Sequence, residues 1–343
     1  MVQKTIDLAC IGSACVDVIM AVSDVFRFEM IDAHSPDTVK KYTAIEYSSK
    51  LNVSSVKFAP GGSAANVASN LGNLGLKTAY IGKIGDDTMG RMTRDDLAKA
   101  GVDLTSCILT KQDATAVSVV LLTPLGKDRS ILAYKGANNL LQPSEIKDDW
   151  LQTVRNLQWT SLTSQSAIET IDKCIIAVKK GGGKVFACPS ISIIKNSHDA
   201  AVKLIKKSDM LVLNKEELIE LTSIKNLMHA MQDALELGPK IVACTDGGTG
   251  SYITDGKTLI SAGVYPVEVA DTTGAGDAFA SGLIYGNLNG MDLEQMVKFG
   301  SAIAAFECMV TGVREGIPHA VATIKDFISK NLLKLEKSTF TGI

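Results

Sequence analysis

Short apolar segments alternate with amphipathic segments of helical length along most of this chain, and this alternation limits the folds open to it. Each apolar segment is rich in aliphatic residues and is bounded by Gly, Asp or Asn, as strands of a buried sheet are. We expect strands at Ile6–Ile11, Thr78–Ile84, Asn156–Leu162, Lys184–Ala187, Met210–Leu213 and Ile241–Thr245. We expect helices at Ser63–Leu74, Thr88–Ala100, Ala167–Lys180, Lys215–Leu221 and Met228–Leu237. Because parallel strands need crossover connections, the pattern predicts an α/β fold with a doubly wound, mostly parallel central sheet flanked by helices.

The composition is that of an ordinary globular protein, with 46% hydrophobic and 21% charged residues and a formal net charge of −2. This balance gives no electrostatic reason to expect nucleic acid or an anionic membrane as a partner. The seven cysteines form no C-x-x-C pair, which argues against a zinc or dithiol site and favours a reducing, cytoplasmic setting. No stretch resembles a membrane helix. Since no repeat or linker divides the 343 residues, we expect one domain spanning 1–343.

Two regions depart from the alternation. Residues 20–58 contain no helix–strand unit, and the strand-like segments Ala116–Thr123 and Ser130–Lys135 flank a turn-rich stretch at 124–128. A hairpin-type connection across residues 124–128 would join these two strands. The extra strands predict either a small sheet over one edge of the main domain or a decorated surface, and the residues alone do not separate these two.

The last third of the chain is mostly helical. Long apolar-faced helices are expected at Ala275–Asn287 and Leu293–Met309, and Pro318 precedes a final helix that runs through Ile328. We expect the tail Lys334–Ile343 to be loosely held.

The segment before the first of these helices carries residues suited to phosphoryl transfer. Val264–Val269 predicts a strand, and residues 271–279, which follow it, read DTTGAGDAF. Small residues allow a ligand close to the backbone, and the free amides at a helix N-terminus favour an anion. Asp277, in the first helical turn, could accept the proton of an attacking hydroxyl beside that anion. Taken alone, Asp277 is better explained as an acid that stabilises the helix.

A longer match changes that interpretation. Residues 271–282, DTTGAGDAFASG, resemble the C-terminal signature of the PfkB/ribokinase family of sugar and nucleoside kinases. The resemblance implies an ATP-dependent kinase in which Asp277 is the catalytic base. It also implies that the backbone amides of Gly274, Ala275 and Gly276 stabilise the transferred phosphate.

An upstream glycine motif supports the same family. Residues 60–68, PGGSAANVA, resemble its N-terminal signature, in which the two glycines, here Gly61 and Gly62, approach the substrate. The resemblance implies that Asn66 binds substrate hydroxyl groups through an amide that both donates and accepts. By itself this motif would be a flexible loop followed by a helix that Ser63 caps. The two motifs together, in this order, favour the kinase.

Shorter matches extend the resemblance over nearly the whole chain. Residues 12–17, GSACVD, resemble an opening motif whose aspartate, Asp17, contacts sugar hydroxyls, although a turn-capping aspartate has the same appearance. Asn138, which follows the extra strands, is a candidate substrate contact. Residues 214–217, NKEE, resemble an element in which Asn214 and Glu217 position magnesium and phosphate. The same spacing fits a helix N-cap with a capping box, and the two interpretations are compatible.

Two loops resemble the nucleotide side of the family. Residues 245–250, TDGGTG, match its phosphate loop, with a plain glycine-rich hairpin as the competing view, and residues 312–318 match its adenine-side loop. The candidate ATP contacts are Asn214, Glu217, Thr245, Gly247, Gly250 and Gly312. The resemblance further implies that the adenine-side backbone, with Asp271 and Thr273, can hold a monovalent cation such as K⁺.

The family also gives the irregular strands a meaning. Its members carry a small β-sheet lid that closes over the sugar, excludes water and often forms a dimer contact. Segments within about 16–58 and 115–136 fall where those strands would be, so the resemblance implies a lid and a homodimer through it. Residues 188–190, CPS, stand where many relatives have a D-x-N element near the metal. Because of this departure, we expect Glu217 to bind Mg²⁺ through water. Because no Walker A sequence is present, we expect the 274–276 turn to bind the phosphate.

The substrate is only broadly defined by these residues. Asp17, Gly62 and Asn66 would recognise vicinal hydroxyls, which sugars and nucleosides share. We therefore expect phosphorylation of a hydroxyl, in the first place a primary CH2OH group, on a small sugar or sugar-containing substrate, with a nucleoside kinase as the alternative. A dinucleotide-dependent oxidoreductase is disfavoured because no G-x-G-x-x-G follows the first strand. A non-catalytic binding relative is disfavoured because Asp277 and its glycine turn are retained.

Overall fold

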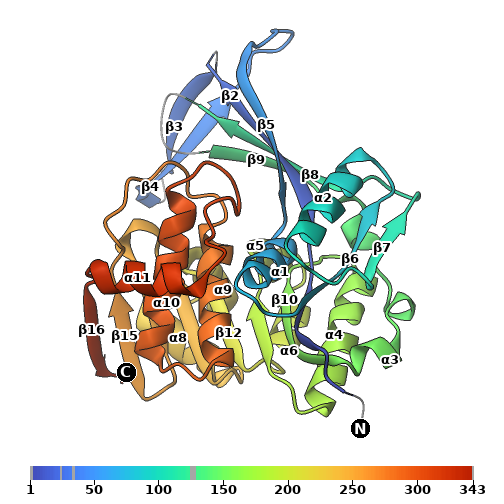
Figure 1. Ribbon diagram of the computed structural model, residues 1–343. Helices are drawn as coiled ribbons and strands as arrows, with labels where there is room; N and C mark the ends of the chain where they lie inside the picture. Colours follow the sequence, from blue (N-terminus) through green and yellow to red (C-terminus); the bar gives the residue numbers. More distant parts are fainter. Residues whose placement is uncertain (1–2, 24, 33–34, 124–128, 342–343) are drawn as a thin grey trace.

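The computed structural model describes residues 3–23, 25–32, 35–123 and 129–341. Within these residues, ten strands form one sheet, mostly parallel, with three antiparallel strands at one edge (Figure 1). In spatial order they are β16 (Leu335–Thr339), β15 (Thr258–Ala262), β14 (Ser251–Thr254), β13 (Ile241–Thr245), β12 (Met210–Asn214), β11 (Val185–Cys188), β10 (Val154–Thr160), β1 (Ile6–Ile11), β6 (Thr78–Gly85) and β7 (Cys107–Thr110). The first strand thus lies inside the sheet, between β10 and β6.

Helices cover both faces of this sheet, because each central strand is apolar on both sides. Within β1, Leu8 and Cys10 pack into the core beneath α1, α9 and α10, whereas Ala9 and Ile11 pack into the opposite core with α4. The helices are α1 (Ser63–Asn73), α2 (Thr88–Lys99), α3 (Asp148–Leu151), α4 (Gln165–Lys180), α5 (Ile191–Asn196), α6 (His198–Ile205), α7 (Lys215–Thr222), α8 (Leu227–Glu236), α9 (Ala275–Leu288), α10 (Leu293–Cys308) and α11 (Val321–Lys330). The expected doubly wound α/β fold is confirmed.

The strands outside the alternation form separate sheets above the main body (Figure 1). One has the order β5 (Val53–Gly61), β2 (Cys15–Val22), β8 (Ala116–Leu122) and β9 (Arg129–Tyr134); the other is the hairpin β3 (Phe26–Asp32) and β4 (Ser35–Ala44). Of the two alternatives, a small sheet is therefore correct. The connection expected across 124–128 lies outside the described residues.

Two expectations for the last third were wrong. Val264–Val269 is not a strand, since Pro266 in its middle lacks an amide hydrogen for a sheet and Val264 and Val269 are half exposed. The tail is not loose over its whole length, because β16 pairs antiparallel with β15 and Phe340 is buried. No helix in the described ranges is long and apolar enough to span a bilayer.

Candidate active site

The carboxyl ends of three neighbouring strands meet the start of α9 at one small cavity. Its volume is about 120 Å³, and its walls include Cys188 at the end of β11, Asn214 at the end of β12 and Thr245 at the end of β13. Gly276 and Asp277 close it from the first turn of α9. In parallel sheets, helix starts and strand ends gather at one edge, which is the usual place for a ligand.

Asp277 lines this cavity and bonds a residue of the upstream glycine motif. Its Oδ2 atom accepts a hydrogen bond of 2.8 Å from Nδ2 of Asn66, which comes from α1. Burial raises the pKa of Asp277, hydrogen bonds from Asn66 and Ser63 lower it, and the charge of Asp17 raises it. The structure therefore joins the two motifs that the sequence places at opposite ends of the chain.

The glycine turn before α9 is shaped by its neighbours. Gly274 is the N-cap with φ of 79°, and a Cβ there would lie 2.1 Å from the carbonyl oxygen of Val313. A side chain is therefore excluded at Gly274. A Cβ at Gly276 would meet no atom within 4 Å, so open space lies beside this residue at the helix N-terminus. That space and the helix dipole suit an anion.

Asn214 and Glu217 form a reciprocal capping box at the start of α7. The Asn214 side chain accepts from the Glu217 amide, the Glu217 side chain accepts from the Asn214 amide, and both bonds measure 2.9 Å. Glu217 also lines the cavity, where burial raises its pKa to about 7. The capping-box interpretation is confirmed, and the position of both side chains at the cavity leaves the magnesium and phosphate role as a prediction.

The substrate-side motifs pack against one another. The carboxylate of Asp17, on β2, packs against Gly61, where a Cβ would lie 2.1 Å from Oδ2 of Asp17. Gly62 has φ of 94° and abuts the backbone of Ala14, and it is Gly62 rather than Ser63 that takes the N-cap position of α1. Both glycines are therefore needed for close backbone approach.

Asn138 has a structural partner that the sequence does not reveal. Its Oδ1 atom accepts from the Ala14 amide at 3.3 Å, and its Nδ2 atom donates to the Ala14 carbonyl at 3.0 Å. The side chain thus holds the turn between β1 and β2 in place beside Gly62.

The two loops that resemble the nucleotide side of the family differ in how they reach the cavity. Residues 247–249 form a single 3₁₀ turn between the antiparallel strands β13 and β14, so this loop is a glycine-rich hairpin in its geometry. Gly250 has a φ of 118°, and a Cβ at this position would lie 1.9 Å from the Ala262 carbonyl oxygen, so a side chain is excluded there. At Gly247 a Cβ would meet no atom within 4 Å. Of the phosphate-loop candidates, Thr245 reaches the cavity.

Asp271 ties the adenine-side loop to the segment before α9. Its Oδ1 accepts from the amide and the hydroxyl of Thr273, at 2.9 and 2.7 Å, and its Oδ2 accepts from the Gly312 amide at 3.4 Å. Lys57, on β5 of the small sheet, donates to the Thr311 carbonyl at 2.5 Å and pairs with Glu315 at 3.0 Å. The small sheet, the adenine-side loop and the glycine turn are thus in contact.

Sequence reasoning missed Arg314. This buried side chain comes from the adenine-side loop, forms an ion pair with Asp96 of α2, and donates from Nη1 to Oδ1 of Asn66 at 3.4 Å. In the sequence, Arg314 is one basic residue among many in a loop and Asp96 is one acid on a helix surface. Only the folded chain brings them to Asn66.

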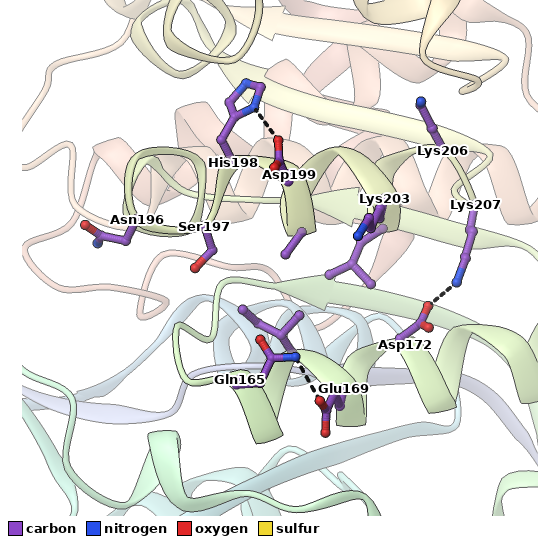
Figure 2. A pocket seen from close by; sticks show the side chains of 13 residues that line it. Gln165, Glu169, Asp172, Asn196, Ser197, His198, Asp199, Lys203, Lys206 and Lys207 are labelled. Atoms are coloured by element: carbon purple, nitrogen blue, oxygen red, sulfur yellow. Dashed lines mark hydrogen bonds and ion pairs between the residues drawn. The ribbon is translucent and has the colours of Figure 1, made fainter.

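A second hollow, of about 920 Å³, lies between α4 and α6, away from these motifs (Figure 2). Among the side chains that line it, Lys207 pairs with Asp172, and Gln165 donates to Glu169 at 2.8 Å. None of the motif residues lines it. The cavity at Asp277 is therefore the candidate active site.

Comparison with known proteins places the chain among its relatives. Residues 5–320 match the family model described as pfkB family carbohydrate kinase. The chain is 28% identical to a 5-dehydro-2-deoxygluconokinase of Bacillus subtilis over 93% of its own length and 94% of that protein. It resembles the adenosine kinase of Sinorhizobium meliloti with a TM-score of 0.78 and 26% identity, covering 94% and 99% of the two chains. It also shares the fold of an Escherichia coli protein assigned as Ribokinase II, solved with ATP and Mg²⁺, with a TM-score of 0.79, 22% identity and coverage of 95% and 99%.

Proposed function

Since this chain belongs to the pfkB family of carbohydrate kinases, we propose that it transfers the γ-phosphate of ATP to a primary hydroxyl group of a small sugar or sugar derivative. It is a phosphotransferase with an alcohol acceptor, as its kinase relatives are. The observation that carries the proposed chemistry is Asp277, half-buried at a helix N-terminus and hydrogen-bonded to Asn66 from the other motif.

In this proposal Asp277 is the general base. Its carboxylate takes the proton from the acceptor hydroxyl as that oxygen forms a bond to the γ-phosphorus, and the bond from phosphorus to the bridging oxygen of ADP breaks. The amides of Gly274, Ala275 and Gly276 would stabilise negative charge on the transferred group. The open space beside Gly276 supports this assignment, because it leaves room for phosphate oxygens.

We assign Mg²⁺ to the wall of the cavity formed by Glu217. No group of three or more His, Cys, Asp or Glu in the described residues could hold a metal ion. A single carboxylate fits magnesium, which usually keeps several waters and binds mainly through substrate phosphates. When bound, Mg²⁺ would neutralise phosphate charge, and Asn214 and Thr245 would contact the nucleotide from neighbouring strand ends.

We also assign a monovalent cation such as K⁺ to the backbone around Asp271 and Thr273. The Asp271 carboxylate joins the two loops whose carbonyl groups would surround the ion. Turnover measured in K⁺ and in an organic cation of equal ionic strength tests this assignment.

On the substrate side, we propose that Asp17 and Asn66 bind vicinal hydroxyls, with Gly61 and Gly62 keeping the backbone close. Asn138 supports them indirectly by fixing Ala14. The small sheet would act as the lid, and its exposed apolar residues, such as Val56, Phe58 and Leu132, would pair two copies of the chain. Free thiols at all seven cysteines suit a reducing cytoplasm.

A substrate panel tests the function. The protein is incubated with ATP, Mg²⁺ and one acceptor at a time, and ADP release is measured for free sugars, sugar acids and nucleosides. Sugar acids are included because of the gluconokinase relative, and nucleosides because of the adenosine kinase neighbour. Acceptor-dependent ADP release supports the proposal, and the absence of stimulation by every acceptor would contradict it.

A further inference from the structure

The loop that begins at Gly312 places the charged side chain of Arg314 against Asn66 of the upstream glycine motif. Arg314 is 8% exposed, and its guanidinium lies between Asp96 of α2 and Asn66 of α1. A buried guanidinium stays charged and presents only donors. Any group that bonds to it must therefore accept.

This restriction decides which way the Asn66 amide points. The oxygen of the amide must face Arg314, and Nη1 of Arg314 donates to it at 3.4 Å. The NH2 group must then face the other way, toward Asp277, where it donates to Oδ2 at 2.8 Å. The Asp277 carboxylate only accepts and requires the same orientation, so the contacts on the two sides of the amide fix it together.

We propose that Arg314 is a positioning residue, which orients the Asn66 amide and through it holds the Asp277 carboxylate toward the acceptor hydroxyl. This inference rests on the proposed function, since it assigns Arg314 a part in the same reaction. Asp96 anchors the guanidinium from the far side, so the row of contacts runs from Asp96 through Arg314 and Asn66 to Asp277.

The same loop also shapes the glycine turn. The carbonyl of Val313, next to Arg314, is the group that excludes a side chain at Gly274. One loop thus contacts the glycine turn through the backbone of Val313, and through the side chain of Arg314 it contacts Asn66, which bonds Asp277. A shift of this loop would disturb both together.

The positive charge of Arg314 also favours the ionised form of Asp277, as the oriented amide of Asn66 does. Among the described groups around Asp277, the charge of Asp17 raises its pKa, the charge of Asp277 in turn raises the pKa of Glu217, and the Cys188 thiol faces the same cavity. Arg314 lowers the pKa of Asp277. Removing Arg314 should therefore move the acid limb of the kcat/KM profile to higher pH.

The kinetic test compares R314M, R314K and D96N, using the best acceptor of the panel. R314M should lower kcat by roughly 10- to 100-fold with KM for ATP nearly unchanged, as loss of one charge-assisted hydrogen bond would. R314K, which keeps the charge, should restore part of the rate, and D96N should show a smaller loss in the same direction. D95N, at the exposed neighbouring position, is the matched control and should behave as wild type. An unchanged kcat and acid limb in R314M would overturn the proposal.

A stability cycle tests the coupling without any turnover. Thermal unfolding is measured for wild type, R314M, D277N and R314M/D277N at pH 8. R314M should lower Tm more in the presence of Asp277 than in the D277N background, because the carboxylate then loses both its cation and its oriented amide. The unpaired Asp96 is common to both comparisons and cancels. Equal losses in the two backgrounds would show that Arg314 does not act on Asp277, whereas failure of every acceptor in the panel would count against the kinase function alone.

Discussion

Replacing Asp277 by Asn removes the proposed base while keeping its shape. The new side chain can still accept the 2.8 Å hydrogen bond from Nδ2 of Asn66, so the cavity should keep its geometry. Loss of a positioned general base typically costs about 10²- to 10⁴-fold in rate, which corresponds to roughly 3–5.5 kcal/mol of transition-state stabilisation. We expect kcat to fall by that factor, with ATP binding largely kept, because the glycine turn contributes backbone groups.

The same substitution should stabilise the fold. Burial raises the pKa of Asp277 above its value in the unfolded chain, so the folded protein binds more protons than the unfolded one. Stability contributed by this group is therefore lost as pH rises through the folded pKa. D277N should unfold at a higher temperature than wild type at pH 8, and the difference should shrink as the pH falls toward 4.

Three measurements check this prediction: ADP release under saturating substrates, ATP affinity by calorimetry, and thermal unfolding between pH 4 and 8. D199N is the matched control, since Asp199 lies in the first turn of α6 with its side chain exposed. A near-normal kcat in D277N would refute the assignment of the base. A lower Tm at pH 8 would refute the argument that the half-buried carboxylate destabilises the fold.

Four further substitutions test the glycine turn, Glu217 and the buried Glu307. G274A should lower both Tm and kcat, because the new Cβ meets the Val313 carbonyl and φ is positive, at a cost of about 1–3 kcal/mol; G276A, with open space around it, should leave Tm unchanged in thermal unfolding, and equal Tm losses would contradict this. E217Q should raise the Mg²⁺ concentration that gives half-maximal rate. In wild type this concentration should fall as the pH rises through about 7, because the Glu217 carboxylate then ionises. When rate is titrated against Mg²⁺, E217Q should lack this pH dependence. E307Q should raise Tm at pH 8 but not at pH 5, because burial raises the pKa of Glu307 to about 7 and the gain is then at most about 3 kcal/mol; unchanged melting curves at pH 8 would speak against it.

The sequence is most informative where one local pattern decides the structure. The strands Ile6–Ile11 and Ile241–Thr245 agree residue for residue with β1 and β13, since buried parallel strands are short and apolar throughout. The expected strand at Val264–Val269 failed because apolar character alone does not supply a hydrogen-bonding neighbour, and Pro266 cannot use one.

The candidate site divides in the same way. Asp277, Gly274 and Gly62 could be predicted as candidates because their proposed roles need particular residue types at fixed spacing. Arg314 and Asp96 could not, since their importance lies in a contact between a loop and a helix that are distant in the chain. Asn138 was predicted as a substrate contact, and the structure shows that it bonds the Ala14 backbone. The sequence could not reveal this partner, because an amide that bonds backbone looks the same in sequence as one that bonds a ligand.

The hydrogen bond between Asn66 and Asp277 spans 211 positions of the chain. A ribosome adding about 5–20 residues per second needs roughly 10–40 s to make that interval. During this time the nascent chain already carries the residues proposed to bind sugar but has neither the base nor the glycine turn. A nascent or prematurely terminated product that stops before α9 would therefore be unable to split ATP, and the activity would appear only when the last third of the polypeptide has folded against the first.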